Sequence, residues 1–229
     1  MSPWRTPRAT AFALVFALAP GLAWAHGTAQ EPAPAASVAT GEAAPLYEAP
    51  AVGSYELPAI SRVTDHVLLD SHGLPARVPD LAPGQAALVS FVYANCGQGC
   101  PLALATLQRL DRELARRPGL AGRVRLVTVS FDPARDTPER MAELRGHLAP
   151  TSEWRFVTAS DEAALGPVLA DYGQSVMRRI DPEGADTGLL GHVLKVFLVD
   201  EFLQIRNVYS VGLLDARLIV NDLETVLAP

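Results

Sequence analysis

The sequence predicts an α/β fold in which a central sheet is flanked by helices. Three observations predict it: two nearly continuous apolar runs of strand length, an alternation of strand and helix patterns, and a hairpin pattern followed by a last helix. An unbroken apolar run is typical of a strand buried on both faces, and strands that alternate with helices form sheets layered by those helices. The chain has 229 residues, 49% hydrophobic and 19% charged, which is enough for a packed core.

Residues 1–25 are expected to be a secretory signal peptide. A start with two arginines is followed by the apolar run 11–18, and Ala23-Trp24-Ala25 matches a small-x-small cleavage site. The apolar run is short for a membrane span, which needs about 20 residues. We therefore expect cleavage before His26 and a periplasmic protein, with a retained membrane anchor on the periplasmic side as the alternative.

Residues 26–53 are predicted to be a flexible tether, because Ala, Pro and Glu dominate them without an apolar period. The folded domain is then expected at 54–229. The formal net charge is −6, and the chain contains no run of Lys and Arg. An acidic chain without a basic stripe is a poor candidate for binding nucleic acid.

The domain is predicted to open with a hairpin. Val67–Leu69 and Ala76–Val78 flank the cluster Asp70–Gly73, which is typical of a turn and places Gly73 where a positive φ is needed.

A βαβ unit follows the hairpin. The runs 87–93 and 124–131 predict two buried strands, and between them 101–117 carries apolar residues on one helical face. Such a unit is right-handed, and its parallel strands end at the same edge of the sheet. Cys96 at the end of the first strand and Asp132 just past the second are therefore expected at the edge where ligand sites of α/β sheets gather.

A helix is predicted at 138–148, with Pro138 in its first turn and Asp136 or Thr137 as its N-cap. Asp136 with Glu139 fits a capping box, which is the favoured interpretation of Asp136. For Asp132 two interpretations stay open: a turn residue, or a carboxylate at the sheet edge that recognises a partner.

The remaining patterns predict a short strand, a helix with acids in its first turn, a hairpin about Asp200-Glu201 and a last helix. In chain order these are 154–158, a helix that opens at 160–162, the strand pair 194–199 and 205–209, and 216–227.

The chain has two cysteines, Cys96 and Cys100, in the stretch FVYANCGQGCP. Outside the cytosol thiols usually form disulfides, but closing so short a loop would restrain the unfolded chain little. A structural disulfide and an incidental turn are therefore less favoured than a redox pair or a pair of metal ligands. Cys100 precedes Pro101 at the expected helix start, where the helix dipole favours a thiolate.

Two soft thiolates select copper(I) or zinc, and a histidine is the natural third ligand. The chain has five: His26, His66, His72, His147 and His192. His192 stands out because it comes just before the strand 194–199. If that strand runs antiparallel to the first two, His192 lies at the same edge as the cysteines. A surface or core histidine with satisfied hydrogen bonds is the alternative.

Three motifs in this order, FVYANCGQGCP, VTVSFDPARDTPERM at 127–141 and HVLKVFLVDEF at 192–202, resemble the Sco/SenC family of thioredoxin-like copper proteins. The resemblance runs from about residue 55 to 227. It implies a thioredoxin-like fold with copper bound by Cys96, Cys100 and His192. It also implies delivery of copper to the dinuclear copper centre of cytochrome c oxidase subunit II.

The sequence departs from the usual family pattern beside each ligand. Ala94, Gly97, Gly191 and Val193 stand where the family commonly has Thr, Pro, Asp and Ser or Thr. The three ligand types are kept while polar neighbours are lost. Such neighbours orient metal ligands and change metal affinity by roughly 10–100-fold.

Two functions follow as hypotheses. The first is a monomeric copper metallochaperone. The second is a thiol–disulfide oxidoreductase that reduces the cysteines of a copper-receiving protein, with attack by Cys96 and resolution by Cys100. The chain lacks the C-x-x-C spacing of thioredoxins and a Pro just before the strand 194–199. Both features favour copper binding.

Overall fold

The computed structural model describes residues 50–96, 99–210 and 214–228. The expected signal peptide 1–25 and most of the expected tether 26–53 lie outside the described residues. The carbonyl oxygen of Pro50 and the amide nitrogen of Gly53 both form hydrogen bonds to the last helix, α4 (Ala216–Val226). Within the described part of the chain, no helix has the length and apolar character needed to cross a bilayer.

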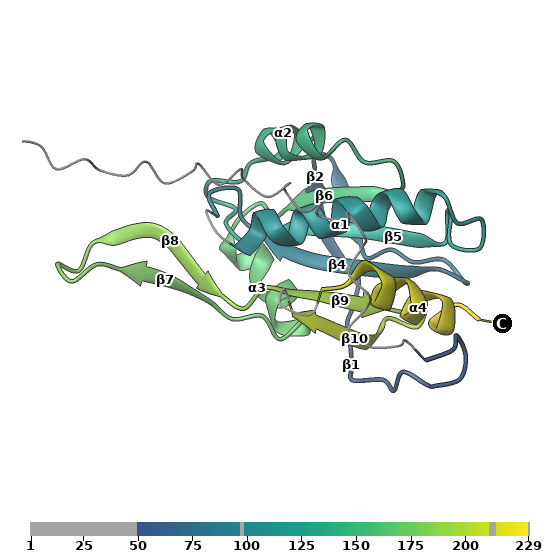
Figure 1. Cartoon of the computed structure of the whole chain (residues 1–229). Coiled ribbons are helices and arrows are strands. Elements are labelled where there is room, and N and C mark those ends of the chain that lie inside the picture. The colour runs from purple at the N-terminus through teal and green to yellow at the C-terminus, as the bar shows by residue number, and fades with distance from the viewer. Residues whose placement is uncertain (1–49, 97–98, 211–213, 229) are drawn as a thin grey trace, which may run out of the picture. The chain divides into compact units, whose positions relative to one another are not determined.

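An eight-stranded mixed sheet forms the centre of the domain (Figure 1). In spatial order its strands are β1 (Ser61–Arg62), β10 (Gln204–Ser210), β9 (Lys195–Val199), β4 (Ala86–Val92), β5 (Val124–Ser130), β6 (Trp154–Thr158), β2 (His66–Asp70) and β3 (Pro75–Val78). β4, β5 and β6 run parallel, and β9 runs antiparallel to β4. The start of β9 therefore lies at the edge where β4 and β5 end, as the sequence analysis required for His192.

β4 and β5 are the most deeply buried strands. All seven residues of each are buried, and they pair in register from Ala86 with Val124 to Val92 with Ser130. Burial on both faces explains why the sequences of these strands are nearly continuous apolar runs and do not alternate between apolar and polar residues.

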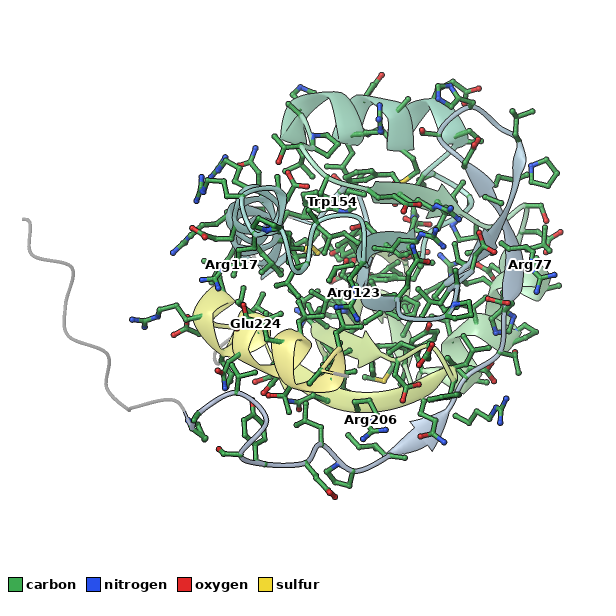
Figure 2. All side chains as sticks on the ribbon, turned by 90° about the vertical axis from the view of Figure 1, so that its right-hand side faces the viewer. Arg77, Arg117, Arg123, Trp154, Arg206 and Glu224 are labelled. Carbon is green, nitrogen blue, oxygen red and sulfur yellow. The ribbon has the colours of Figure 1, made fainter. Side chains whose placement is uncertain are left out.

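Helices cover both faces of the sheet. Figures 1 and 2 show α1 (Gly99–Ala115) next to α4 on one face and α3 (Glu162–Asp171) on the other. Arg117, just after α1, pairs with Glu224 of α4 over 2.9 Å, as Figure 2 shows. α2 (Pro138–Leu148) packs against β6.

The predicted N-terminal hairpin is confirmed. β2 and β3 pair antiparallel, and Gly73 has a φ of 76° in the turn between them. The side chain of Asp70 accepts hydrogen bonds from the amides of His72 and Leu74, which closes the turn.

The capping residue of α2 is Thr137, whose side chain accepts a hydrogen bond from the amide of Arg140. The expected capping box of Asp136 with Glu139 is therefore wrong. The Asp136 side chain is instead buried, and its carboxylate accepts hydrogen bonds from the Ala94 amide and from Ser130 Oγ.

A second, two-stranded sheet was not predicted. β7 (Val176–Ile180) and β8 (Asp186–His192) form an antiparallel hairpin that projects from the rest of the domain (Figure 1). Most of its residues are exposed, so it lacks the buried apolar pattern that marks the other strands. His192 is the last residue of β8 and does not lie in a loop before β9.

Candidate metal centre

The structure brings Cys96, Cys100 and His192 together. One ligand atom of each residue, a Sγ or an imidazole nitrogen, lies within 4.8 Å of the other two. Cys96 follows the end of β4, Cys100 lies in the first turn of α1, and His192 ends β8. The juxtaposition depends on β9 being antiparallel to β4, because this returns the chain to the carboxyl end of the parallel strands.

The two cysteines are present as thiols. The amide of Cys96 donates to the carbonyl oxygen of Tyr93 over 3.2 Å, and the amide of Cys100 donates to Cys96 Sγ over 3.3 Å. Cys100 is buried and Cys96 is half-buried. The Cys96 sulfur is therefore the more accessible of the two, and it receives an N–H group at the start of a helix.

Burial raises the pKa of the Cys100 thiol to about 12, with a further increase from its hydrogen bond with Cys96. The expected Cys100 thiolate is therefore wrong for the metal-free protein, because loss of solvation outweighs the helix N-terminus. A metal ion that binds this sulfur must displace its proton.

The imidazole of His192 packs against two aromatic rings that also contact each other. Its centroid lies 4.4 Å from that of Phe131 and 6.1 Å from that of Tyr93. Burial lowers the pKa of His192, partly offset by a hydrogen bond with the backbone of Val193. At neutral pH the ring is therefore neutral, which is the state that binds metals.

The Nδ1 atom of His192 is buried and has no hydrogen-bond partner. An unpaired buried polar atom costs roughly 1–3 kcal/mol, and such atoms in native proteins often mark a bound ion. Two thiols and an imidazole nitrogen form a donor set that suits a soft metal ion.

Asp136 secures the start of the cysteine turn. Its Oδ2 atom accepts hydrogen bonds from the amide of Ala94 over 3.0 Å and from Ser130 Oγ over 2.5 Å. The side chain is 2% exposed, and burial raises its pKa above the ordinary value. This role of Asp136 was not predicted from the sequence, although its position just beyond the end of β5 is a usable signal.

The carboxylate of Asp132 is also buried, and its Oδ2 atom accepts a hydrogen bond from Arg135 Nη1 over 2.7 Å. It does not offer a surface carboxylate to a partner, so the turn interpretation of Asp132 holds.

The other described histidines are not members of the cluster, although His147 lines the cavity beside the two thiols. His66 contacts Asp171 over 2.8 Å, and His147 Nδ1 contacts the carbonyl oxygen of Glu143. His72 lies in the β2–β3 turn. His26 lies outside the described residues.

A cavity of about 360 Å³ opens beside the two thiols, between α1 and α2. Tyr93, Leu104, Leu144 and His147 contribute to its walls. The thiols are therefore accessible from a largely apolar opening.

Comparison with known proteins agrees with this geometry. The family model described as SCO1/SenC matches residues 56–228. The chain belongs to the SCO1/SenC family. A search of curated proteins finds no match.

Solved structures of this family share the fold. A SCO1/SenC family lipoprotein from Bacillus anthracis has a TM-score of 0.63 at 20% identity, covering 75% of this chain and 99% of its own. Arabidopsis thaliana ScoI, solved with copper bound, has a TM-score of 0.60 at 19% identity, covering 72% and 98%. BsSco, of the Sco family of cytochrome c oxidase assembly proteins, has a TM-score of 0.58 at 19% identity, covering 74% and 96%. The predicted thioredoxin-like α/β fold is confirmed.

Proposed function

We propose that the protein is a copper metallochaperone that binds copper through Cys96, Cys100 and His192. The observation that carries the proposal is the convergence of two thiols and a histidine, each with a ligand atom within 4.8 Å of the others, with Nδ1 of the histidine buried and unpaired. Thiolates and a neutral imidazole suit copper(I), while the imidazole also supports copper(II). The copper-bound Arabidopsis family member supports copper over zinc.

Binding to this donor set releases protons. The Cys100 thiol, with its raised pKa, loses its proton as the sulfur bonds to the metal, whereas His192 is already neutral. Transfer then proceeds by ligand exchange, in which donors of the acceptor replace the sulfurs and the imidazole one at a time. Because His192 lies on the hairpin and the cysteines on the β4–α1 turn, one ligand can leave while the other two stay in place.

The acceptor is a protein that receives copper during cytochrome c oxidase assembly. The specific target that we propose is the dinuclear copper centre of cytochrome c oxidase subunit II. Membership of BsSco in a family of oxidase assembly proteins supports the acceptor class. We further propose an exported monomer that acts on the periplasmic side of the membrane. The signal pattern of residues 1–25 and the lipoprotein among the family members support export.

A second function is favoured by the unequal exposure of the two sulfurs. The half-buried Cys96 would attack a disulfide of the acceptor as the thiolate, forming a mixed disulfide and releasing one acceptor thiol. The buried Cys100 would then attack Cys96 Sγ, which releases the second acceptor thiol and leaves a Cys96–Cys100 disulfide. One acceptor disulfide is reduced and one dithiol is oxidised, and the two activities can coexist.

Anaerobic titration of the reduced and the oxidised domain tests the main proposal. The reduced protein should bind one copper ion tightly, and the Cys96–Cys100 disulfide form should not, because both thiolates are gone. Zinc titrated in parallel should bind more weakly than copper(I). Equal copper uptake by the two redox forms would remove the metallochaperone hypothesis.

A further inference from the structure

The turn that joins β5 to α2, residues 131–136, contacts both segments that carry the ligands of the candidate copper site. We infer that this turn, called here the bridging turn, sets the position of His192 relative to the two cysteines, and that Arg135 is the positioning residue that holds β8 against it. The inference rests on the proposed function, in which His192 is a copper ligand.

The bridging turn is anchored to the core of the sheet. The amide of Phe131 donates to the carbonyl oxygen of Val92 over 3.0 Å, which extends the ladder between β4 and β5 by one residue. The amides of Arg135 and Asp136 both donate to the carbonyl oxygen of Asp132, and the amide of Asp132 donates to Ser130 Oγ. A turn with this many internal bonds is a rigid reference point.

One end of the bridging turn holds the cysteine segment. Asp136 accepts the hydrogen bond from the amide of Ala94, two residues before Cys96. The same carboxylate oxygen accepts from Ser130, so the start of the cysteine turn is tied to the end of β5.

The other contacts of the bridging turn are made with β8. The ring of Phe131 packs on the imidazole of His192. Four residues earlier in β8, the guanidinium of Arg135 lies against Gly188: a Cβ at Gly188 would be 3.5 Å from Arg135 Nη2 and 3.9 Å from its Cζ. Gly188 has a φ of 71°, so glycine suits its backbone, and the guanidinium lies at ordinary contact distance from the position of a Cβ there.

Arg135 is held in place by carboxylates. Nη1 donates to the buried Asp132, which leaves Nη2 facing the hairpin. The hydrogen bond from Arg135 to Asp132 raises the pKa of the guanidinium, with further contributions from the charges of Asp132, Asp186 and Asp136. Asp186 is the first residue of β8. The positive charge of Arg135 therefore lies between the core and the hairpin and attracts carboxylates on both.

The β7–β8 hairpin is mostly exposed, so its position depends on its contacts with the rest of the domain. β7 is connected to the domain by an ion pair between Arg178 and Glu162 of α3, and Arg178 also contacts Asp186. β8 carries His192 and is held by the bridging turn and by Tyr93, whose hydroxyl donates a hydrogen bond to the carbonyl oxygen of Leu190 over 3.5 Å. Loosening β8 should displace the imidazole, while the cysteine turn keeps its own hydrogen bonds to Asp136.

The test compares Arg135→Lys with a matched control, Arg140→Lys. Each arginine pairs with a carboxylate three residues away, Asp132 for Arg135 and Glu143 for Arg140, and a lysine can keep that pair. Only Arg135→Lys removes a guanidinium that lies against β8. Arg135→Ala removes the charge as well, and unfolding is followed for all variants.

Two measurements are made on the full domain. In the reduced, metal-free protein, amide hydrogen exchange of β8 should be roughly tenfold faster in Arg135→Lys and unchanged in Arg140→Lys. In the copper(II)-loaded protein, Arg135→Lys should weaken copper(II) affinity by roughly tenfold and change the electron paramagnetic resonance spectrum, with larger effects for Arg135→Ala. Copper(I) affinity, which the two thiolates support, should change less.

Wild-type exchange rates and spectra in Arg135→Lys and Arg135→Ala would overturn the inference. Faster exchange with an unchanged copper(II) spectrum would also overturn it, because β8 would then move without displacing a ligand. If the wild-type protein binds no copper at all, the proposed function fails, and the exchange measurement alone still decides whether Arg135 holds β8.

Discussion

Asp136 accepts a hydrogen bond from the amide of Ala94 over 3.0 Å and so ties the segment before Cys96 to the end of β5. Asp136→Ala removes this carboxylate and leaves the Ala94 amide and Ser130 Oγ without their acceptor. We expect a loss of roughly 2–3 kcal/mol in the free energy of unfolding, measured by urea denaturation. Asp136→Asn keeps one acceptor oxygen and should lose less.

The pH dependence of stability should differ between wild type and Asp136→Asn. Burial raises the pKa of Asp136 in the folded state above its ordinary value of 3.8. A raised pKa contributes stability that is fully present below the unfolded-state pKa and is lost as pH rises through the folded-state pKa. Because asparagine does not titrate, wild type should lose stability relative to Asp136→Asn as pH rises above 3.8 and through the raised pKa of Asp136. A difference that stays constant, or that moves the other way, would contradict the raised pKa.

His192→Ala separates the two proposed functions. The variant keeps both thiols but loses the imidazole, so copper(II), which favours nitrogen donors, should bind more than roughly 100-fold more weakly. Copper(I) should bind slightly more weakly, and disulfide reduction of a model substrate should be nearly unchanged. Competition titrations and thiol-exchange rates measure these effects.

Cys100→Ser is the comparison for His192→Ala, because it removes both a ligand and the proposed resolving thiol. It should impair copper binding and disulfide reduction together. Wild-type affinity of His192→Ala for both copper states would show that the histidine is not a ligand. Slower thiol–disulfide exchange in His192→Ala would show that the histidine changes the reactivity of the thiols.

Gly191→Asp introduces the acidic residue that the family commonly has before the histidine, and the structure has room for a Cβ at this position. A Cβ at Gly191 would lie 3.7 Å from the carbonyl oxygen of Met177 and 3.8 Å from Arg179 Nε, which is ordinary contact. We expect unfolding free energy within about 0.5 kcal/mol of wild type. A polar group beside His192 should strengthen copper(II) binding by up to roughly tenfold.

Gly188→Asp is the matched control on the same strand. Gly188 has a φ of 71°, so an aspartate there is strained and should destabilise the protein by about 1 kcal/mol or more. Equal stability of the two variants, or weaker copper(II) binding by Gly191→Asp, would count against this account of Gly191.

The exported protein should begin at His26. Intact-mass measurement of the periplasmic form should show a chain without residues 1–25, because the AWA sequence follows the apolar run. A membrane-bound form that retains these residues would support the anchor instead.

Much of the fold follows from the sequence because buried segments have a local pattern of apolar residues. β4 and β5 are buried on both faces, so their residues are mostly apolar, and α1 shows one apolar face. The pairing of Cys96 with Cys100 is also local, since four residues span one turn. The sequence alone thus determined most strands of the central sheet, the four helices of the described residues and the two sulfur donors.

Only the tertiary structure decided the features that depend on distant or exposed groups. The β7–β8 hairpin has no buried pattern to reveal it, yet it carries His192. The roles of Asp136 and Arg135 depend on neighbours about 40 to 50 residues away, such as Ala94 and Gly188. The pKa of Cys100 depends on how deeply α1 buries its first turn, and loss of solvation there outweighs the helix dipole that the sequence alone suggests.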